Sequence, residues 1–119
     1  MSTQERGRSG EQIAAAEYEK EGYTVEARNF RTRFGEVDLI LRKGGLYVFS
    51  EVKTRAMTTV IPPAAAVTPM KQQKIILAAQ GYLAHKRLSD PNARFDVVEV
   101  FIGPGGSTKV NIIENAFTL

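Results

Sequence analysis

Apolar residues recur along this chain with two different periods, and each period predicts one kind of secondary structure. Residues 10–20 and 70–86 place mainly apolar side chains three and four positions apart, which is the spacing of one face of an α-helix. The two stripes are Ile13, Ala14, Glu17 and Tyr18, and Ile75, Ala78, Ala79 and Tyr82. We therefore predict two amphipathic helices.

Five other segments are rich in β-branched and aromatic residues, which favour strands. These segments are residues 23–30, 36–42, 46–53, 94–102 and 109–116. Gly44 and Gly45 separate the second and third strands and are a strong hairpin signal. The element order α-β-β-β-α-β-β predicts an α+β or mixed α/β domain built on one sheet. Residues 54–69 are predicted to form a long loop, and such connections are often functional.

The hairpin centred between Gly44 and Gly45 predicts which residues of its two strands face one another. Asp38 then lies opposite Glu51, and Glu36 lies opposite Lys53. Because side chains alternate along a strand, all four should lie on the same face of the sheet. The opposite face should be mostly core, formed by Val37, Leu39 and Leu41 against Val48, Ser50 and Val52.

Two carboxylates directly opposite one another repel, and a divalent cation would remove this repulsion. Asp38 and Glu51 offer hard oxygen ligands that suit Mg²⁺ or Mn²⁺, and the carbonyl of Val52 could add a third ligand. Lys53 would orient an attacking water or stabilise developing charge, so metal-assisted phosphodiester hydrolysis is the natural reaction class. The alternative is structural: Glu36 and Lys53 form a cross-strand ion pair, and the other two acids are solvated.

Composition narrows the class of protein. The 119 residues fit a single domain, 1–119, and the absence of cysteine excludes disulfides and thiolate metal sites. No apolar run approaches the roughly 20 residues that span a bilayer, and the N-terminus lacks the apolar region of a secretory signal. We therefore expect a cytoplasmic protein that does not associate with membranes, with residues 1–9 as a flexible N-terminus.

The distribution of charge suggests a polyanionic partner. Residues 28–55 carry seven basic and three acidic side chains, net +4, although a solvated basic face is a comparable reading. Arg28, Arg31 and Arg33 interleave with Phe30 and Phe34, as in a loop that grips a nucleic-acid backbone and offers an aromatic ring for stacking. The structural alternative puts Phe30 in the core. Lys71 and Lys74 could extend the basic track, whereas Arg94 and Asp96 are expected to form a structural pair.

Several blocks of this sequence carry a family resemblance. An acid on one strand followed by Glu-x-Lys on the next resembles the PD-(D/E)xK nuclease superfamily. More closely, the chain resembles the small bacterial YraN-like family, itself largely uncharacterised and described as similar to archaeal Holliday junction resolvases. The blocks run from about residue 10 to about residue 100. They are Gly10-Glu11, Gly22-Tyr23, Arg28-Asn29-Phe30, Gly35 to Ile40, Glu51 to Arg55, Ala66-Val67-Thr68, Lys71-Gln72 and Arg94 to Val98.

This resemblance implies a restriction-endonuclease-like core, which is a mixed sheet flanked by helices. It implies that Asp38 and Glu51 are metal ligands, that Lys53 is the catalytic lysine, and that Glu11 is a helical acid near the metal. Arg55, Lys71 and Gln72 join Arg28, Arg31 and Arg33 as expected nucleic-acid contacts. Two positions depart from the family pattern: Ser50 replaces a bulky aliphatic residue, and the loop at 60–63 lacks the usual glycine.

Three functions follow as hypotheses. The first is a metal-dependent endonuclease, or nuclease-like protein, that acts on branched DNA. The second is a non-catalytic nucleic-acid-binding module with the same fold, and the third is a protein-interaction domain whose acidic hairpin is only a surface. If the junction analogy holds, a homodimer is expected, because a four-way junction offers two equivalent strands.

Overall fold

The structure is a computed structural model, and it describes residues 3–57, 67–88 and 90–118, with side chains from residue 9 onward. Two α-helices and five strands follow one another in the predicted order α-β-β-β-α-β-β, with a short 3₁₀ turn, η2, before the last strand. The elements are α1 (Thr3–Lys20), β1 (Thr24–Arg31), β2 (Glu36–Lys43), β3 (Leu46–Ala56), α2 (Pro69–His85), β4 (Asn92–Ile102), η2 (Pro104–Gly106) and β5 (Thr108–Phe117).

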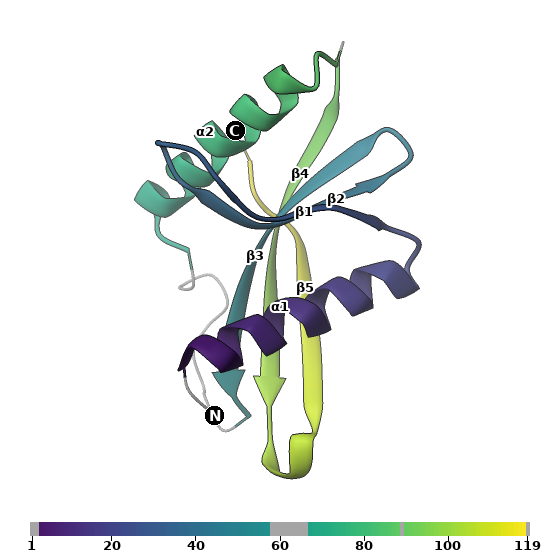
Figure 1. The fold of residues 1–119 in the computed structure, drawn as a ribbon, viewed down its shortest axis with the longest axis vertical. Coiled ribbons are helices and arrows are strands. Elements are labelled where there is room, and N and C mark those ends of the chain that lie inside the picture. Colours follow the sequence, from purple (N-terminus) through teal and green to yellow (C-terminus); the bar gives the residue numbers. More distant parts are fainter. Residues whose placement is uncertain (1–2, 58–66, 89, 119) are drawn as a thin grey trace.

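The five strands form one mixed sheet in the spatial order β1-β2-β3-β4-β5. All neighbouring pairs are antiparallel except β3 and β4, which run parallel and are connected through α2. In Figure 1, α1 (purple) crosses β3, β4 and β5, while α2 (green) runs past the connection between β1 and β2. This mixed sheet with two helices confirms the predicted fold class and is consistent with a restriction-endonuclease-like fold.

Each face of the sheet carries its own apolar cluster, so the sheet is covered on both sides. Ala14, Ala15 and Tyr18 of α1 pack against Leu39, Leu41, Val48, Val98 and Val100. Ile75, Ala78, Ala79 and Tyr82 of α2 pack against Val37, Ile40, Phe49, Phe95 and Val97. The prediction that Val37 shares a face with Leu39 is therefore wrong, because Val37 belongs to the α2 side and Leu39 to the α1 side.

This change of face has a local cause in β1. Asn29 takes a positive φ of 49°, which breaks the regular alternation of side chains. Phe30 on one side of Asn29 pairs with Val37, and Arg28 on the other side pairs with Leu39. Phe30 packs edge-on against Tyr82 of α2, with ring centroids 5.3 Å apart, so it is a core residue as the structural alternative predicted.

Several element boundaries differ from the prediction. The helix α1 begins at Thr3 rather than at residue 10, so helical backbone extends into the segment expected to be flexible. The strand β3 continues through Ala56, because its last residues pair with Val100, Phe101 and Ile102 of β4, a tertiary contact that local composition does not reveal. The predicted loop feature at 60–63 lies outside the described residues. No helix among the described residues is long and apolar enough to cross a membrane.

Candidate functional site

The candidate site forms where β2 and β3 separate. The two strands pair in the predicted register from Lys43 and Leu46 up to Leu39 and Ser50, and this pairing ends there. Beyond this point β2 continues beside β1, and β3 continues beside β4. The side chain of Asp38 enters the fork, where its Oδ2 accepts a hydrogen bond from the backbone amide of Val52 at 2.8 Å. The Asp38 carboxylate thus takes the place of the backbone carbonyl that would accept this hydrogen bond if the two strands stayed paired.

Glu51 lies across the fork and is almost fully buried, at 5% exposure. Its Oε1 lies 2.6 Å from the Nζ of Lys71 on α2 and 3.5 Å from the Nζ of Lys53 on its own strand. Both ammonium groups therefore approach the same carboxylate oxygen. The Glu36–Lys53 ion pair of the structural alternative is absent among the described contacts, because Glu36 pairs with Arg31 at 3.3 Å.

The carboxylates at the fork are not fully neutralised. Burial, followed by repulsion from Glu51, raises the pKa of the Asp38 carboxyl to about 7. Burial also raises the pKa of Glu11 on α1; a hydrogen bond with Asn29 opposes this rise, and repulsion from Glu36 and Glu51 adds to it. The acid that resemblance placed near the metal is therefore within electrostatic reach of the fork. Burial and neighbouring acids thus disfavour the ionised forms of Asp38 and Glu11, and a bound cation would relieve the repulsion between the carboxylates.

The two lysines of the site respond in opposite directions. Burial lowers the pKa of Lys53, and the neighbouring Lys71 lowers it further. Burial would also lower the pKa of Lys71, but its interactions with Glu51, Lys53 and Asp38 together outweigh burial and raise it. Lys71 is therefore the firm counter-ion of Glu51, and Lys53 is the ammonium that gives up its proton more readily.

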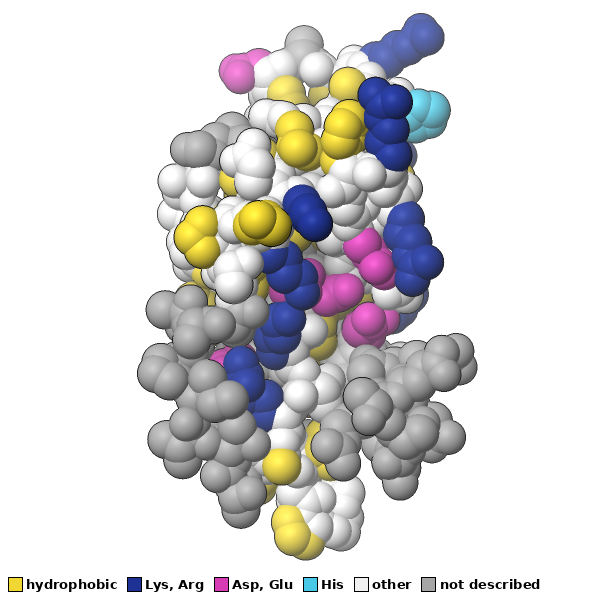
Figure 2. Space-filling view, turned by 90° about the vertical axis from the view of Figure 1, so that its left-hand side faces the viewer, with side chains coloured by type: hydrophobic (Ala, Val, Ile, Leu, Met, Phe, Trp, Pro, Cys, Tyr) yellow, Lys and Arg dark blue, Asp and Glu magenta, His cyan; other side chains and the backbone are white. Residues whose placement is uncertain are grey.

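A cleft of about 160 Å³ opens onto the fork from the α2 side. Its lining residues are Gly35, Glu36, Asp38, Glu51, Lys71, Lys74 and Ile75. Figure 2 shows Asp and Glu side chains (magenta) gathered near the middle of one face, between Lys and Arg side chains (dark blue). Gly35 sits so close to α2 that an added Cβ would lie 2.9 Å from the carbonyl oxygen of Lys74, so this wall needs glycine.

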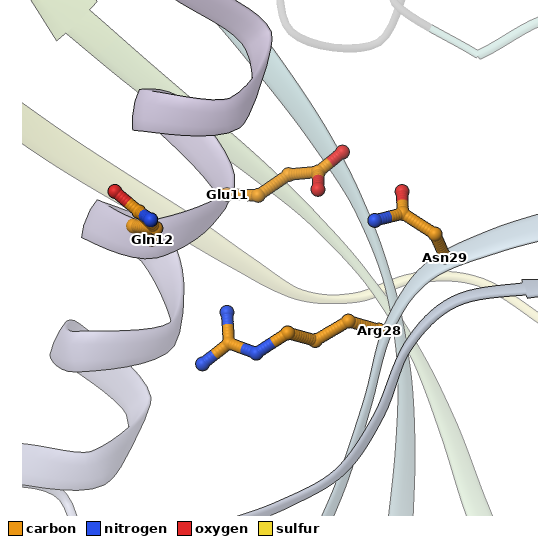
Figure 3. Close-up of a pocket in the computed structure, with 4 residues that line it drawn as sticks. All are labelled: Glu11, Gln12, Arg28 and Asn29. Atoms are coloured by element: carbon orange, nitrogen blue, oxygen red, sulfur yellow. The ribbon is translucent and has the colours of Figure 1, made fainter.

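A second cavity, of about 450 Å³, lies between α1 and β1 and is lined by Glu11, Gln12, Arg28 and Asn29. Figure 3 shows the carboxylate of Glu11 extending toward Asn29, and the guanidinium of Arg28 extending toward the helix. Of the basic residues predicted to contact nucleic acid, Arg28 lines this cavity, and Lys71 and Lys74 line the cleft.

The other predicted nucleic-acid contacts are engaged within the protein. Arg31 pairs with Glu36, and the guanidinium of Arg33 lies 4.8 Å from the ring centroid of the exposed Phe34. The Nε2 of Gln72 donates to the carbonyl of Val67 at 3.1 Å, which ties down the start of α2. Arg55 is largely buried, and its Nε lies 3.3 Å from Oε2 of Glu99. Arg31 and Arg33 are exposed, whereas Arg55 and Gln72 have partners within the fold, and the contact of all four with nucleic acid stays a prediction.

The donor set at the fork fits a hard cation that keeps part of its water shell. No group of three or more His, Cys, Asp or Glu converges on one point among the described residues. Asp38 and Glu51 supply two carboxylates, however, and the amide of Val52 points toward β2. Because the amide and carbonyl of one strand residue point to the same side, the Val52 carbonyl also faces the fork. Two carboxylates, a carbonyl and water match the way proteins bind Mg²⁺.

A different polar cluster lies on the α1 face of the sheet, around the inaccessible carboxylate of Asp96. Arg94 donates to both Asp96 oxygens, at 2.9 and 3.0 Å, which confirms the predicted structural pair. The hydroxyl of Tyr18 donates to Oδ2 of Asp96 at 2.8 Å, and the backbone amide of Asn115 donates to Oδ1 at 3.0 Å. Ser50 lies 3.0 Å from the Tyr18 hydroxyl, so its departure from the family pattern completes this network.

Sequence reasoning missed three polar residues that the fold uses. Gln12 and Asn29 line the larger cavity, and Glu99 is buried beside Arg55. An asparagine within a predicted strand was the available signal for the first cavity, since Asn tolerates positive φ. An isolated acid in the apolar run of β4 was the signal for Glu99.

Comparison with known proteins matches nearly the whole chain to a single protein family. Residues 10–100 match the model of the uncharacterised protein family UPF0102. A UPF0102 protein of Symbiobacterium thermophilum is 47% identical over 111 residues, covering 93% of this chain and 94% of the relative. UPF0102 proteins of Syntrophus aciditrophicus and Geobacter sulfurreducens are 46% and 45% identical, each covering 95% of this chain and 88% of the relative. The YraN-like resemblance of the sequence is confirmed by these matches.

Proposed function

The chain belongs to the UPF0102 family, and we propose that it is a metal-dependent endonuclease that hydrolyses phosphodiester bonds in structured, branched DNA. One observation carries the proposal: Asp38 and Glu51 face one another across a strand fork, beside Lys53, in a cleft walled by lysines. The link to the PD-(D/E)xK nucleases is part of this proposal and is supported by the acid–Glu-x-Lys spacing on two strands of a mixed sheet.

A divalent cation is proposed because the partly buried carboxylate of Asp38 and the buried carboxylate of Glu51 meet at the fork, and a cation would relieve their mutual repulsion. Repulsion between Glu51 and Asp38 contributes to an Asp38 pKa of about 7. Asp38, Glu51 and the Val52 carbonyl would hold Mg²⁺ or Mn²⁺, with water completing the shell. When bound, the cation would polarise the phosphoryl group and lower the pKa of an attacking water.

Lys53 has the position and the environment for a direct role in the reaction. Its side chain is 26% exposed, and its ammonium lies 3.5 Å from Oε1 of Glu51. A scissile phosphate in the cleft would compete with Glu51 for this ammonium. Lys53 would then orient the attacking water or stabilise the charge that develops on the phosphoryl oxygens.

The cationic walls support a phosphate-bearing substrate. Lys71 and Lys74 of α2 line the cleft, and Arg33 lies two residues before Gly35, which also lines it. Phe34 is exposed at 48% and is stacked under Arg33, so it offers an aromatic face to an unstacked base. If the substrate is a four-way junction, two copies of the chain would act on its two equivalent strands as a homodimer.

The test is a cleavage assay on labelled four-way junction, flap, single-stranded and duplex DNA with Mg²⁺ or Mn²⁺. Asp38→Asn and Lys53→Ala should abolish cleavage, while the exposed controls Asp90→Asn and Lys109→Ala should leave it unchanged. Metal-dependent cutting that both site variants lose, with binding retained, would establish the nuclease. Salt-sensitive binding without cutting would instead favour the non-catalytic nucleic-acid-binding module. If the protein neither cuts nor binds any of these DNAs, both the nuclease and the nucleic-acid-binding module are wrong.

A further inference from the structure

The cavity between α1 and β1 has the size of a ligand site and a lining rich in hydrogen-bonding groups. Its volume of about 450 Å³ falls within the range of small-molecule pockets. Its described walls are a carboxyl, a guanidinium and two carboxamides, from Glu11, Arg28, Gln12 and Asn29. Figure 3 shows Glu11 and Arg28 reaching across the gap between the helix and the strand, with Gln12 on the helix and Asn29 on the strand.

The strand is bent in a way that builds this cavity. Residues two apart on a strand normally share a face, yet Phe30 packs into the α2-side cluster while Arg28 faces α1. The positive φ of Asn29 produces this switch. The bend frees Arg28 and Asn29 to line the space that α1 closes from the other side.

Glu11 connects the cavity with the fork. Its carboxyl shares a hydrogen bond with Asn29 of the cavity wall and also feels the charges of Glu36 and Glu51, which line the cleft. Asp38 in turn feels the charge of Glu11. The cleft and the cavity therefore open on the two sides of the same group of acids, and a ligand in the cavity would lie beside the proposed reaction centre.

The chemistry of the lining selects a nucleotide among possible ligands. Carboxamides offer a donor and an acceptor side by side, which matches the edge of a nucleobase, and the guanidinium matches a phosphate. No salt bridge of Arg28 occurs among the described residues, so its guanidinium is available to an anion.

We propose that the cavity is a nucleotide subsite, in which Gln12 and Asn29 contact the base of an unpaired nucleotide and Arg28 contacts its phosphate. This inference rests on the proposed function, because it places that nucleotide next to the scissile phosphate. A base stacked inside a continuous duplex could not enter the cavity. The substrate class is therefore nucleic acid with a single-stranded or splayed nucleotide at the cut, as in a flap, a loop or an open junction.

The test measures binding and cleavage separately. Binding is measured by fluorescence anisotropy with full-length Asp38→Asn protein without metal, using labelled single-stranded DNA, the same sequence as RNA, and an abasic version of the DNA. Gln12→Ala should weaken binding of normal DNA about threefold to tenfold, the effect of one or two hydrogen bonds, and leave the salt dependence unchanged. Arg28→Ala should lower the salt slope by about 0.7, the value for one phosphate contact on a single strand.

The decisive comparison is the affinity lost when the bases are removed. If Gln12 contacts a base, this loss should be smaller in Gln12→Ala than in the exposed control Gln80→Ala, and Arg87→Ala is the control for Arg28. Equal losses in Gln12→Ala and its control would overturn the subsite. Because Gln12 is an exposed helix residue and Ala favours helices, the variant should fold. DNA and RNA arms that differ would show which sugar the subsite accepts.

Failure of the subsite can be told apart from failure of the nuclease. If the unmodified protein cuts DNA with Mn²⁺ and Gln12→Ala cuts flap DNA equally well, the subsite alone is wrong. If the unmodified protein cuts no substrate, the proposed function is wrong, and the abasic comparison still decides whether the cavity binds a base.

Discussion

Two acidic clusters lie on opposite faces of the same sheet, and they differ in how completely their charge is satisfied. Asp96 on the α1 face is inaccessible to solvent and accepts hydrogen bonds from Arg94, Tyr18 and Asn115. Asp38 at the fork accepts one backbone amide, from Val52, and faces a second carboxylate, Glu51. Hydrogen-bond donors thus offset the cost of burying the carboxylate fully at Asp96 and only in part at Asp38.

The difference separates a carboxylate whose partners all lie within the fold from one that we propose binds a cation. A buried charge is tolerated when it is paired and hydrogen-bonded, and the bidentate arginine of Asp96 does both. At the fork, Asp38 has no salt bridge among the described residues. The lysines that face Glu51 are long, flexible side chains that a phosphate could recruit. The fork also opens to solvent through the cleft, whereas Asp96 is enclosed.

The largest effect is expected from removing the charge of the satisfied cluster. Asp96→Asn leaves the partly buried Arg94 without its charged bidentate partner, and breaking a buried pair in this way costs up to about 3–5 kcal/mol. Urea unfolding should therefore show a large loss of stability, whereas the exposed control Asp90→Asn should stay within about 0.5 kcal/mol of the unmodified protein. A small loss for Asp96→Asn would mean that the network does not depend on its charge.

Metal binding should affect the other cluster alone. At a Mn²⁺ concentration 100-fold above its dissociation constant, a single site should stabilise the fold by about 2.7 kcal/mol. The melting temperature of the unmodified protein should rise accordingly at pH 8, and the rise should be lost in Asp38→Asn. Asp90→Asn, which removes an exposed acid, should keep the full rise. An equal rise in Asp38→Asn would locate the cation elsewhere.

Removing the charge of Asp38 should stabilise the metal-free protein, whereas removing the charge of Asp96 should destabilise it. The pKa of Asp38 is raised to about 7 in the folded chain from 3.8, so the folded state holds a proton that the unfolded chain has lost between these values. Metal-free stability should therefore fall as pH rises through this window. Asp38→Asn should stabilise the metal-free protein at pH 8 by roughly 1–2 kcal/mol and flatten its pH profile in thermal melts. A destabilised variant at pH 8 would contradict an uncompensated charge.

The β2–β3 hairpin shows how much of the difference between the Asp38 and Asp96 clusters could be predicted from the sequence. Gly44-Gly45 and the strand periodicity were enough to predict the observed register, and with it the meeting of Asp38 and Glu51. The fork was not predictable, because it depends on β2 staying with β1 while β3 follows β4, a choice set by tertiary pairing. The bend at Asn29, which moves Val37 to the other face, had only a weak local signal.

The Asp96 cluster was predictable only as a pair. Arg94 and Asp96 lie two positions apart on one strand, which predicts neighbouring side chains on one face. Tyr18 and Asn115 reach the same carboxylate from α1 and from β5, and contacts over such sequence distances arise only when the helix packs on the sheet. For the same reason the sequence did not reveal that Glu99 is the partner of Arg55 and the Val67 carbonyl the partner of Gln72.

The smallest effect should come from the edge of the satisfied cluster. Ser50 is fully buried and contacts the Tyr18 hydroxyl at 3.0 Å, and that hydroxyl also donates to Asp96 at 2.8 Å. Ser50→Ala removes one contact but leaves Tyr18 with its stronger partner, so the loss should be about 1 kcal/mol in urea unfolding. In an Asp96→Asn background the same change should cost a different amount, because residues of one network are not additive. Strictly additive losses would show that Ser50 fills space beside the network without belonging to it.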